Sequence, residues 1–213
     1  MLVASQGVIT AEHNENLFND FDQESLMLHM RSQEGPDLLS GDLDGDGLDD
    51  VVLLGSTESA DKVFIHNSGG KFIRKAQPTL DNDKDYEGVT GLLYDLDNDK
   101  DLDLIIGVGG NEVSRGIAYY KIRSYLNDGT GLFETNESIV LPIAGNLSGL
   151  VDLELDGRRA IFASSLGVPG NYGLVSRNFL LVEEQAGIWK DMTTQELGQI
   201  GICLLYTSDA ADE

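Results

Sequence analysis

The chain has 213 residues, of which 41% are hydrophobic and 24% are charged. A chain of this length and composition can bury a hydrophobic core, which excludes a disordered acidic tail and a membrane-spanning protein. It carries 14 Lys and Arg against 37 Asp and Glu, a formal net charge of −23. Such a surface repels nucleic acid and anionic lipid and attracts cations, so nucleic acid is not an expected partner.

The first 35 residues lack a clear strand pattern. Residues 15–31 place apolar side chains in a loose amphipathic order at Leu17, Phe18, Phe21, Leu26 and Leu28. We therefore expect 1–35 to be a leading segment that is partly helical or irregular. Its start has no positive region followed by an apolar stretch, so this chain shows no signal peptide.

An acidic repeat organises the rest of the chain. Two copies span Asp42–Gly55 and Asp95–Gly107, and a degenerate third copy spans Asp152–Ala163. Each is followed by an apolar run, a polar turn and an aromatic residue, namely Phe72, Phe133 and Trp189. Short β-prone runs separated by turns such as Asn-Asp-Gly indicate hairpins, and a period of about 50–60 residues matches one blade of a β-propeller. Packing between strands explains the recurring aromatics better than a sugar-stacking platform.

The pattern predicts an all-β fold, a partial β-propeller of about three four-stranded blades. No segment of helical period separates the strands, which excludes an α/β fold. The blades are placed at 36–80, 88–143 and 147–196. Between the first two, Asp81–Asp85 also alternates acids, but Val89 stands where a metal loop needs a carboxylate, so this segment is interpreted as a solvated connector.

The first two repeats have the spacing of a calcium loop. Counted from the first aspartate, acids occupy positions 1, 3, 5 and 9, and position 7 offers a backbone carbonyl. The predicted ligands are Asp42, Asp44, Asp46, the Leu48 carbonyl and Asp50 in one loop, and Asp95, Asp97, Asp99, the Asp101 carbonyl and Asp103 in the other. Calcium takes six to eight oxygen ligands in irregular geometry. Without a cation, each pair of carboxylates would repel by about 1 kcal/mol at about 4 Å in water.

The residues at the end of each loop exclude an EF-hand. An EF-hand requires a bidentate acid at position 12 and a flanking helix. Position 12 is Leu53 in the first loop and Ile106 in the second, and the apolar runs around them predict buried strands. The loops should therefore connect strands.

The loops are not equivalent. Position 6, where the backbone turns sharply, is Gly47 in the first loop and Lys100 in the second. If φ is positive there, the lysine costs on the order of 1 kcal/mol.

A third calcium site is doubtful. It would use Asp152, Glu154 and Asp156, but Ala160 stands at position 9. We expect this degenerate loop to be empty or weak, with Arg158 or Arg159 supplying the missing positive charge.

The acidic loops resemble FG-GAP/VCBS repeats, the calcium-loop blades of integrin-like β-propellers. Residues 148–193 are similar to bacterial proteins related to cartilage acidic protein, which often carry an ASPIC/UnbV domain. Residues 13–21 and 30–36 resemble the stretch that precedes the propeller in large surface proteins of this kind. The resemblance implies calcium at the four acids of each of the first two loops, in an exported, multi-domain protein used for binding. It supplies neither a ligand nor a catalytic activity.

The favoured function is a non-catalytic propeller module of an extracellular or cell-surface protein, in which structural calcium supports adhesion to a protein or a glycan. Loops of this kind would be empty in a cytosol with nanomolar calcium, which favours export. The alternative is a propeller enzyme, a lyase or a glycoside-processing protein, whose active site lies on blades that are missing here. A purely structural spacer is a third possibility. His13, His29 and His66 are isolated, and no nucleophile elbow or HExxH motif is present.

The last residues, 203–213, resemble a translated sequencing adapter, so we exclude them from the fold. They hold the single cysteine, and the remaining chain offers no thiol enzyme, zinc ribbon or disulfide scaffold. Because propellers close with typically four to eight blades, we expect this chain to be a fragment whose remaining blades belong to the same full-length protein.

Overall fold

The structure is a computed structural model that describes residues 9, 17–23, 25, 36–110, 118–168, 174 and 176–198. These residues form twelve strands and three short helices. The strands are β1 (Leu38–Gly41), β2 (Asp50–Leu53), β3 (Lys62–His66), β4 (Phe72–Lys75), β5 (Gly88–Tyr94), β6 (Asp103–Val108), β7 (Arg123–Asn127), β8 (Phe133–Thr135), β9 (Asn146–Leu155), β10 (Arg158–Gly167), β11 (Phe179–Gln185) and β12 (Ile188–Asp191). The helices are α1 (Asp20–Gln23), α2 (Pro78–Asn82) and α3 (Thr193–Glu196).

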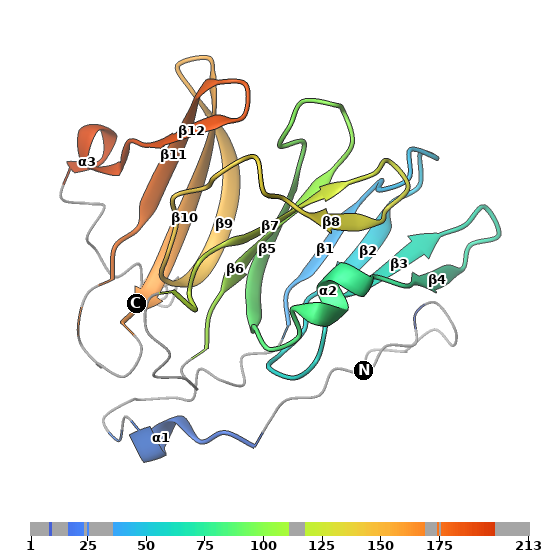
Figure 1. Cartoon of the computed structure of the whole chain (residues 1–213), viewed down its shortest axis with the longest axis horizontal. Helices are drawn as coiled ribbons and strands as arrows, with labels where there is room; N and C mark the ends of the chain where they lie inside the picture. The colour runs from blue at the N-terminus through green and yellow to red at the C-terminus, as the bar shows by residue number, and fades with distance from the viewer. Residues whose placement is uncertain are drawn as a thin grey trace, which may run out of the picture.

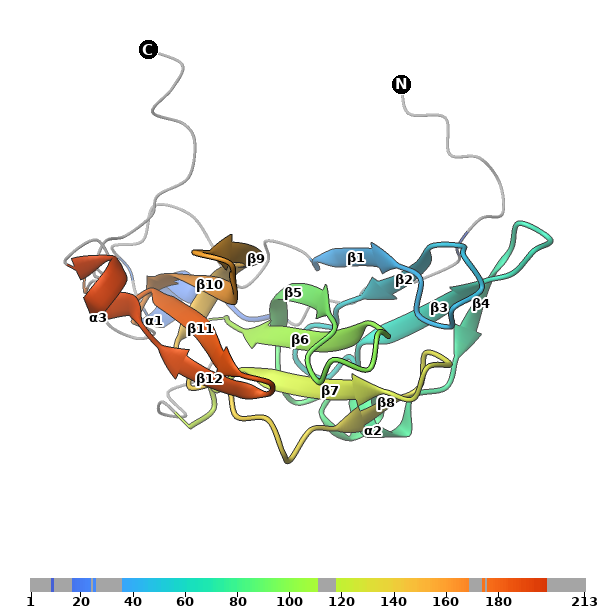
Figure 2. The same ribbon diagram turned by 90° about the horizontal axis from the view of Figure 1, so that it is seen from above.

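The strands make three four-stranded antiparallel sheets, each a meander of strands consecutive in the chain. The sheets stand side by side in Figure 1. Figure 2 shows β1, β5 and β9, the first strand of each sheet, toward one side of the molecule. These first strands are in contact, β5 with both β1 and β9. Blades with neighbouring inner strands are the plan of a β-propeller. The prediction of an all-β, partial propeller is thereby confirmed.

The middle sheet is packed on both faces. All six residues of β6 are buried, including the run Leu104–Ile106. Because side chains alternate between faces along a strand, Leu104 and Ile106 join a core shared with the first sheet, whereas Ile105 joins a core shared with the third. A continuous apolar run is the expected pattern for a strand covered on both faces.

A leucine from each acidic loop anchors that loop in the core. Leu43 is 1% exposed and belongs to the core between the first and second sheets. Leu96, at the same position of the second loop, is fully buried between the second and third sheets. The acidic residues around these leucines are therefore held at the edge of a packed interface between blades.

Short helices depart from the sequence expectation. We expected helical structure only in the leading segment, yet α2 begins after the first sheet and extends into the segment interpreted as a connector. Pro78 stands in its first turn and Leu80 is buried beneath it. Proline suits the first turn of a helix because the amide it lacks would have no partner there. Five residues are too few for a helical period to be visible in the sequence.

Of the leading segment, the structure describes α1 and a few neighbours, and residues 203–213 lie outside the described part. Within the described ranges, no helix has the length and hydropathy needed to cross a membrane.

Candidate metal centres

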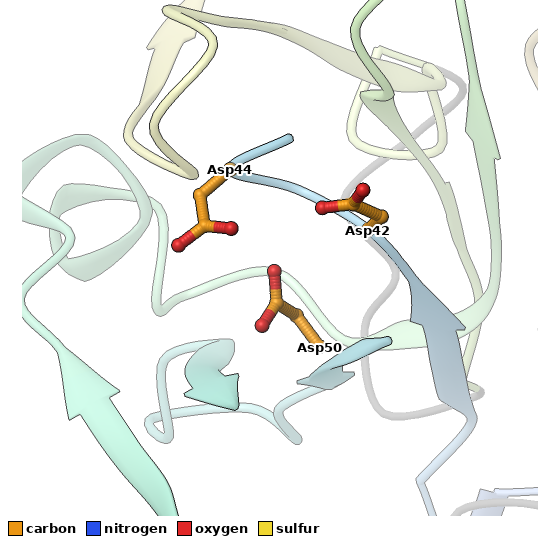
Figure 3. A group of neighbouring side chains, drawn as sticks. All are labelled: Asp42, Asp44 and Asp50. Carbon is orange, nitrogen blue, oxygen red and sulfur yellow. The ribbon is translucent and has the colours of Figure 1, made fainter. Parts of the chain in front are cut away.

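The first acidic loop connects β1 to β2 and gathers three carboxylates. Asp42, Asp44 and Asp50 each present an oxygen, and these atoms lie within 4.8 Å of one another. Figure 3 shows the three side chains turned toward a shared centre. Asp46, predicted as a further ligand, is exposed and stands outside this group. Its Oδ1 accepts the amide of Leu48, the other predicted ligand, at 2.8 Å.

Backbone amides shape this loop around Asp42. Its Oδ1 accepts the amide of Gly45 at 2.8 Å, and its Oδ2 accepts that of Gly47 at 2.9 Å. These two residues have φ of 74° and 85°. Glycine adopts such angles without the clash that a Cβ atom would cause. Oδ1 also accepts the Asp46 amide at 3.2 Å. A carboxylate oxygen has two lone pairs, so Oδ2, which accepts a single amide, keeps acceptor capacity for a cation.

Asp50 closes the loop from the far end. Its Oδ2 accepts the buried Leu43 amide at 2.9 Å, and its Oδ1 accepts the His66 amide at 2.7 Å. One carboxylate thus ties the start of the loop to the end of β3. Burial raises the pKa of Asp50, and the two amides oppose that shift. The side chain is therefore a member of the carboxylate group. It is also a clasp, by which we mean a carboxylate whose two oxygens accept backbone amides from the start of the loop and from a following strand.

The second acidic loop, between β5 and β6, gathers Asp95, Asp97 and Asp99 within the same 4.8 Å limit. The buried Oδ1 atoms of Asp95 and Asp101 have no hydrogen-bond partner. Burial, followed by the contact with Asp99, raises the pKa of Asp101 to about 7. Buried carboxylate oxygens without a donor are costly, and either a proton or a bound cation would lower that cost.

Asp103 repeats the clasp in the second loop. It is fully buried, and its two oxygens accept the amides of Leu96 at 2.7 Å and Asn127 at 2.9 Å. Burial raises its pKa to about 6, against the effect of both amides. Unlike Asp50 it is not in the three-carboxylate group, so the structure brings together positions 1, 3 and 9 in the first loop but positions 1, 3 and 5 in the second.

Both loops receive a contact from the next blade, which the sequence alone did not indicate. Asn127 of β7 donates its Nδ2 to the Leu43 carbonyl at 2.8 Å and to the Leu102 carbonyl at 3.2 Å. Arg159 of β10 donates to the Asp95 carbonyl and to Asn98 Oδ1 of the second loop. Each acidic loop is therefore held by a side chain of the following sheet.

The third repeat forms no acidic loop. Strands β9 and β10 join through a two-residue turn in which Asp156 and Gly157 have φ of 51° and 74°. Asp152 and Glu154 lie within β9 instead of a loop. The Asp-Gly pair between β-prone runs is the signal for this hairpin turn. The expectation of a degenerate calcium loop is corrected to a continuous hairpin.

Of the two arginines expected to supply positive charge to the third repeat, Arg159 contacts groups of the second and third sheets. The Arg159 guanidinium stacks on Tyr94, 4.5 Å from the ring centroid, and pairs with Glu183 Oε2 at 3.2 Å. It therefore bridges the second and third sheets beside the second loop.

Backbone strain separates the two loops and leads to a first prediction. Lys100 has φ of 86°, matching Gly47, and Asn98 has φ of 68° where the first loop has glycine. Substituting Lys100→Gly should raise the free energy of unfolding by about 1 kcal/mol, because the Cβ clash of a left-handed residue disappears. For a chain of this size the melting temperature should rise by about 2–4 °C, measured in chelator.

Lys100→Ala is the control for charge, because it removes the ammonium group and keeps the Cβ atom. It should give little of the gain. Equal stabilisation by alanine and glycine would show that the lysine charge, and not its backbone angle, is responsible.

Comparisons with known proteins concern the same region. Residues 42–106, which include both acidic loops and make up less than a third of the chain, match the model of the FG-GAP-like repeat family. Among solved structures, the chain is similar to an Agrocybe aegerita lectin studied for specific recognition of non-reducing terminal N-acetylglucosamine, with 17% identity and a TM-score of 0.45 over 74% of this chain. The chain spans 38% of that structure. No curated protein matches it.

Proposed function

We propose that this chain is a non-catalytic, calcium-stabilised propeller module of an exported or cell-surface protein, and that it binds another protein or a glycan. The FG-GAP-like repeat at 42–106 and the blade arrangement support a propeller module. The net charge of −23 favours cations over anionic partners. The sequence contains neither a G-x-S-x-G nor an H-E-x-x-H motif, in keeping with a non-catalytic role.

The observation that carries the calcium proposal is the convergence of carboxylates in two loops of the same design. Three aspartate oxygens lie within 4.8 Å of one another in each loop. In the second loop, the buried Oδ1 atoms of Asp95, which belongs to the group, and of Asp101 have no donor. Hard oxygen ligands in an irregular strand-connecting loop suit calcium better than magnesium, which demands octahedral geometry.

Calcium in these loops would have a structural role. The clasps Asp50 and Asp103 connect each loop to the following strands, and the leucines at position 2 connect it to the core. A cation that neutralises the converging acids therefore stabilises the junction between neighbouring blades. Binding surfaces of the full protein would then be held in place by this rigid frame.

The energetics favour a location outside the cell. Extracellular calcium modules bind with dissociation constants near 10⁻⁴–10⁻³ M. At about 1–2 mM calcium, the tighter end of that range stabilises the fold by about 1.4–1.8 kcal/mol per site. Nanomolar cytosolic calcium would leave such loops empty.

Isothermal titration calorimetry of the chelator-treated chain tests the calcium proposal. We expect two sites for calcium, binding at least tenfold weaker for magnesium, and a higher melting temperature in 2 mM calcium than in chelator. Asp42→Ala should abolish one of the two sites. Asp49→Ala removes an exposed acid of the same loop that is not in the carboxylate group, and it should leave both sites intact.

The proposal fails if calcium gives neither heat nor a thermal shift. It also fails if Asp49→Ala weakens binding as much as Asp42→Ala, because binding would then reflect only the diffuse negative charge of the surface.

A further inference from the structure

One side chain, that of Asn127 at the end of β7, contacts both acidic loops. Its Nδ2 donates to the Leu43 carbonyl of the first loop at 2.8 Å and to the Leu102 carbonyl of the second loop at 3.2 Å. Its Oδ1 accepts the Gly131 amide at 2.9 Å, and its backbone amide donates to Asp103 Oδ1 at 2.9 Å. The residue is only 7% exposed. With both polar atoms of its side chain held, Asn127 is a fixed bridge between the two loops.

An unbroken series of hydrogen bonds connects the two clasps through this bridge. In the first loop, the Leu43 amide donates to Asp50 Oδ2, and the Leu43 carbonyl accepts from Asn127. In the second loop, the Asn127 amide donates to Asp103, whose other oxygen accepts the Leu96 amide. All five residues are buried, so water competes little for these hydrogen bonds. Buried hydrogen bonds are stronger than those in water, and they polarise one another along such a series.

The series reaches the converging acids of the first loop. Asp50, at its end, is one of the three side chains that face a shared centre in Figure 3. The Leu43 carbonyl and the Asp44 amide belong to the same planar peptide unit, so holding this carbonyl also fixes the direction in which the backbone enters Asp44. Asp44 is another of the three acids. The position of the Asn127 side chain is therefore coupled to the placement of two acids of this group.

The bridge also holds the last residues of the second loop. The side chain and the amide of Asn127 fix the Leu102 carbonyl and the Asp103 carboxylate, which directly follow Asp101 in the chain. The buried Oδ1 of Asp101 has no hydrogen-bond partner. A cation that satisfies this oxygen would order the same stretch of backbone that holds Asn127 in place.

The backbone and the side chain of Asn127 have separable roles. His66 occupies the equivalent position in the first sheet, since it pairs with Phe72 as Asn127 pairs with Phe133. The His66 amide also donates to a clasp, Asp50, but its ring stacks on Phe72 with the ring centroids 4.4 Å apart. A clasp therefore needs only a backbone amide, which any residue except proline supplies, whereas the bridge between loops needs the asparagine side chain.

We propose that Asn127 couples the two cation sites, so that a divalent cation bound in one acidic loop raises the affinity of the other loop. This coupling rests on the calcium sites proposed above and concerns how they act together. A cation that orders either loop also immobilises the Asn127 side chain, so the second cation binds a loop whose bridge is already ordered. Repulsion between the two cations opposes the coupling, but salt screens that repulsion and does not reach the buried hydrogen bonds.

Calorimetric titration with calcium at about 0.15 M salt measures the coupling. Asp42→Ala disables the first loop and Asp97→Ala disables the second, so each variant gives the binding constant of the remaining loop alone. The product of the two wild-type binding constants, divided by the product of the two constants from the variants, is the coupling factor. We expect a factor of at least about five. Two sites with a factor of about one or less overturn the coupling and leave the calcium proposal standing, whereas the absence of any calcium binding overturns both.

Substitutions assign the coupling to the bridge. Asn127→Ala removes the bridge and keeps the backbone amide that donates to Asp103, so both loops should still bind calcium while the coupling factor falls to about one. Asn136→Ala is the matched control, because Asn136 is a part-buried asparagine whose Nδ2 donates to Ser124 Oγ and to the Ile139 carbonyl, in neither loop. It should keep the wild-type factor. An unchanged factor in Asn127→Ala, or an equal loss in Asn136→Ala, overturns the assignment.

Hydrogen exchange gives a second measurement that needs no substitution at Asn127. In the Asp42→Ala chain calcium can occupy only the second loop, yet it should slow exchange of the Leu43 amide in the first loop. We expect at least about fivefold slowing beyond any change at the Leu180 amide, a buried amide of the third sheet that donates to Thr193. Equal slowing of the two amides would indicate a general gain in stability without transmission through the bridge, and would overturn the coupling.

Discussion

The Asp103→Ala chain should lose about 2–5 kcal/mol of unfolding free energy even in chelator, because two buried backbone amides lose their acceptor at once. These are the amides of Leu96 and Asn127, both residues that are buried between sheets. Denaturant unfolding in chelator measures the effect with no contribution from a bound cation. This is the largest change we expect from any single acidic residue of the second loop.

Asp99→Ala is the matched comparison, since it removes an exposed acid from the same loop. Asp99 belongs to the carboxylate group, so its loss should barely change stability in chelator and should remove most of the stabilisation by calcium. Asp103→Asn keeps one acceptor oxygen and should fall between the two. Equal stability of the Asp103→Ala and Asp99→Ala chains in chelator would show that the buried carboxylate is no clasp.

The same reasoning applies to the first loop, where Asp50 holds the amides of Leu43 and His66. There the clasp is also one of the three converging acids. Asp50→Ala should therefore lower the free energy of unfolding in chelator. It should also reduce the additional stabilisation that calcium gives. The position-9 acid of the first loop thus has two roles, whereas its equivalent Asp103 in the second loop has only the structural one.

Sequence periodicity was enough to predict the blades, because each repeat brings its own strands and turns. Register within a hairpin is a local property, because it depends on the strands and the turn of that repeat. Equivalent residues therefore pair in the first two sheets, His66 with Phe72 and Asn127 with Phe133. The convergence of the acids at positions 1 and 3 also follows from the short turn that they occupy, and their role as metal ligands stays a prediction.

What the sequence could not show depends on contacts between repeats. Arg159 is 64 residues from Asp95, whose carbonyl it contacts, and no local pattern relates the two. Asn127 holds a loop in the preceding blade for the same reason. In the third repeat, alternate acids suggested a worn calcium loop, but the Asp156-Gly157 turn favoured a hairpin. In this repeat, the preference of Asp-Gly for a tight turn predicts the observed structure, and the alternate spacing of the acids does not.

The calcium affinity of the second loop should rise about tenfold between pH 6 and pH 8. A cation there must displace protons from carboxyl groups whose pKa values are raised. Burial raises the pKa of Asp101 to about 7 and that of Asp103 to about 6, well above the value of an aspartate in an unfolded chain. The calcium-free fold therefore binds protons that the unfolded chain has released. The stability that these groups give the calcium-free fold is therefore lost as the pH rises from about 4, the pKa of an unfolded aspartate, to about 7, the pKa of Asp101.

If the second loop binds calcium as proposed, calcium should reverse this trend, since a divalent cation favours the ionised carboxylates. The thermal shift caused by calcium should accordingly be larger at pH 8 than at pH 6, and calorimetry at the two pH values measures the affinities directly. Asp101→Asn removes the group with the higher pKa and should flatten the pH dependence between pH 6 and 8, whatever its effect on affinity at a single pH. A wild-type affinity that is the same at both pH values would show that calcium and protons do not compete in this loop, and that the acids of the second loop are already ionised before the cation arrives.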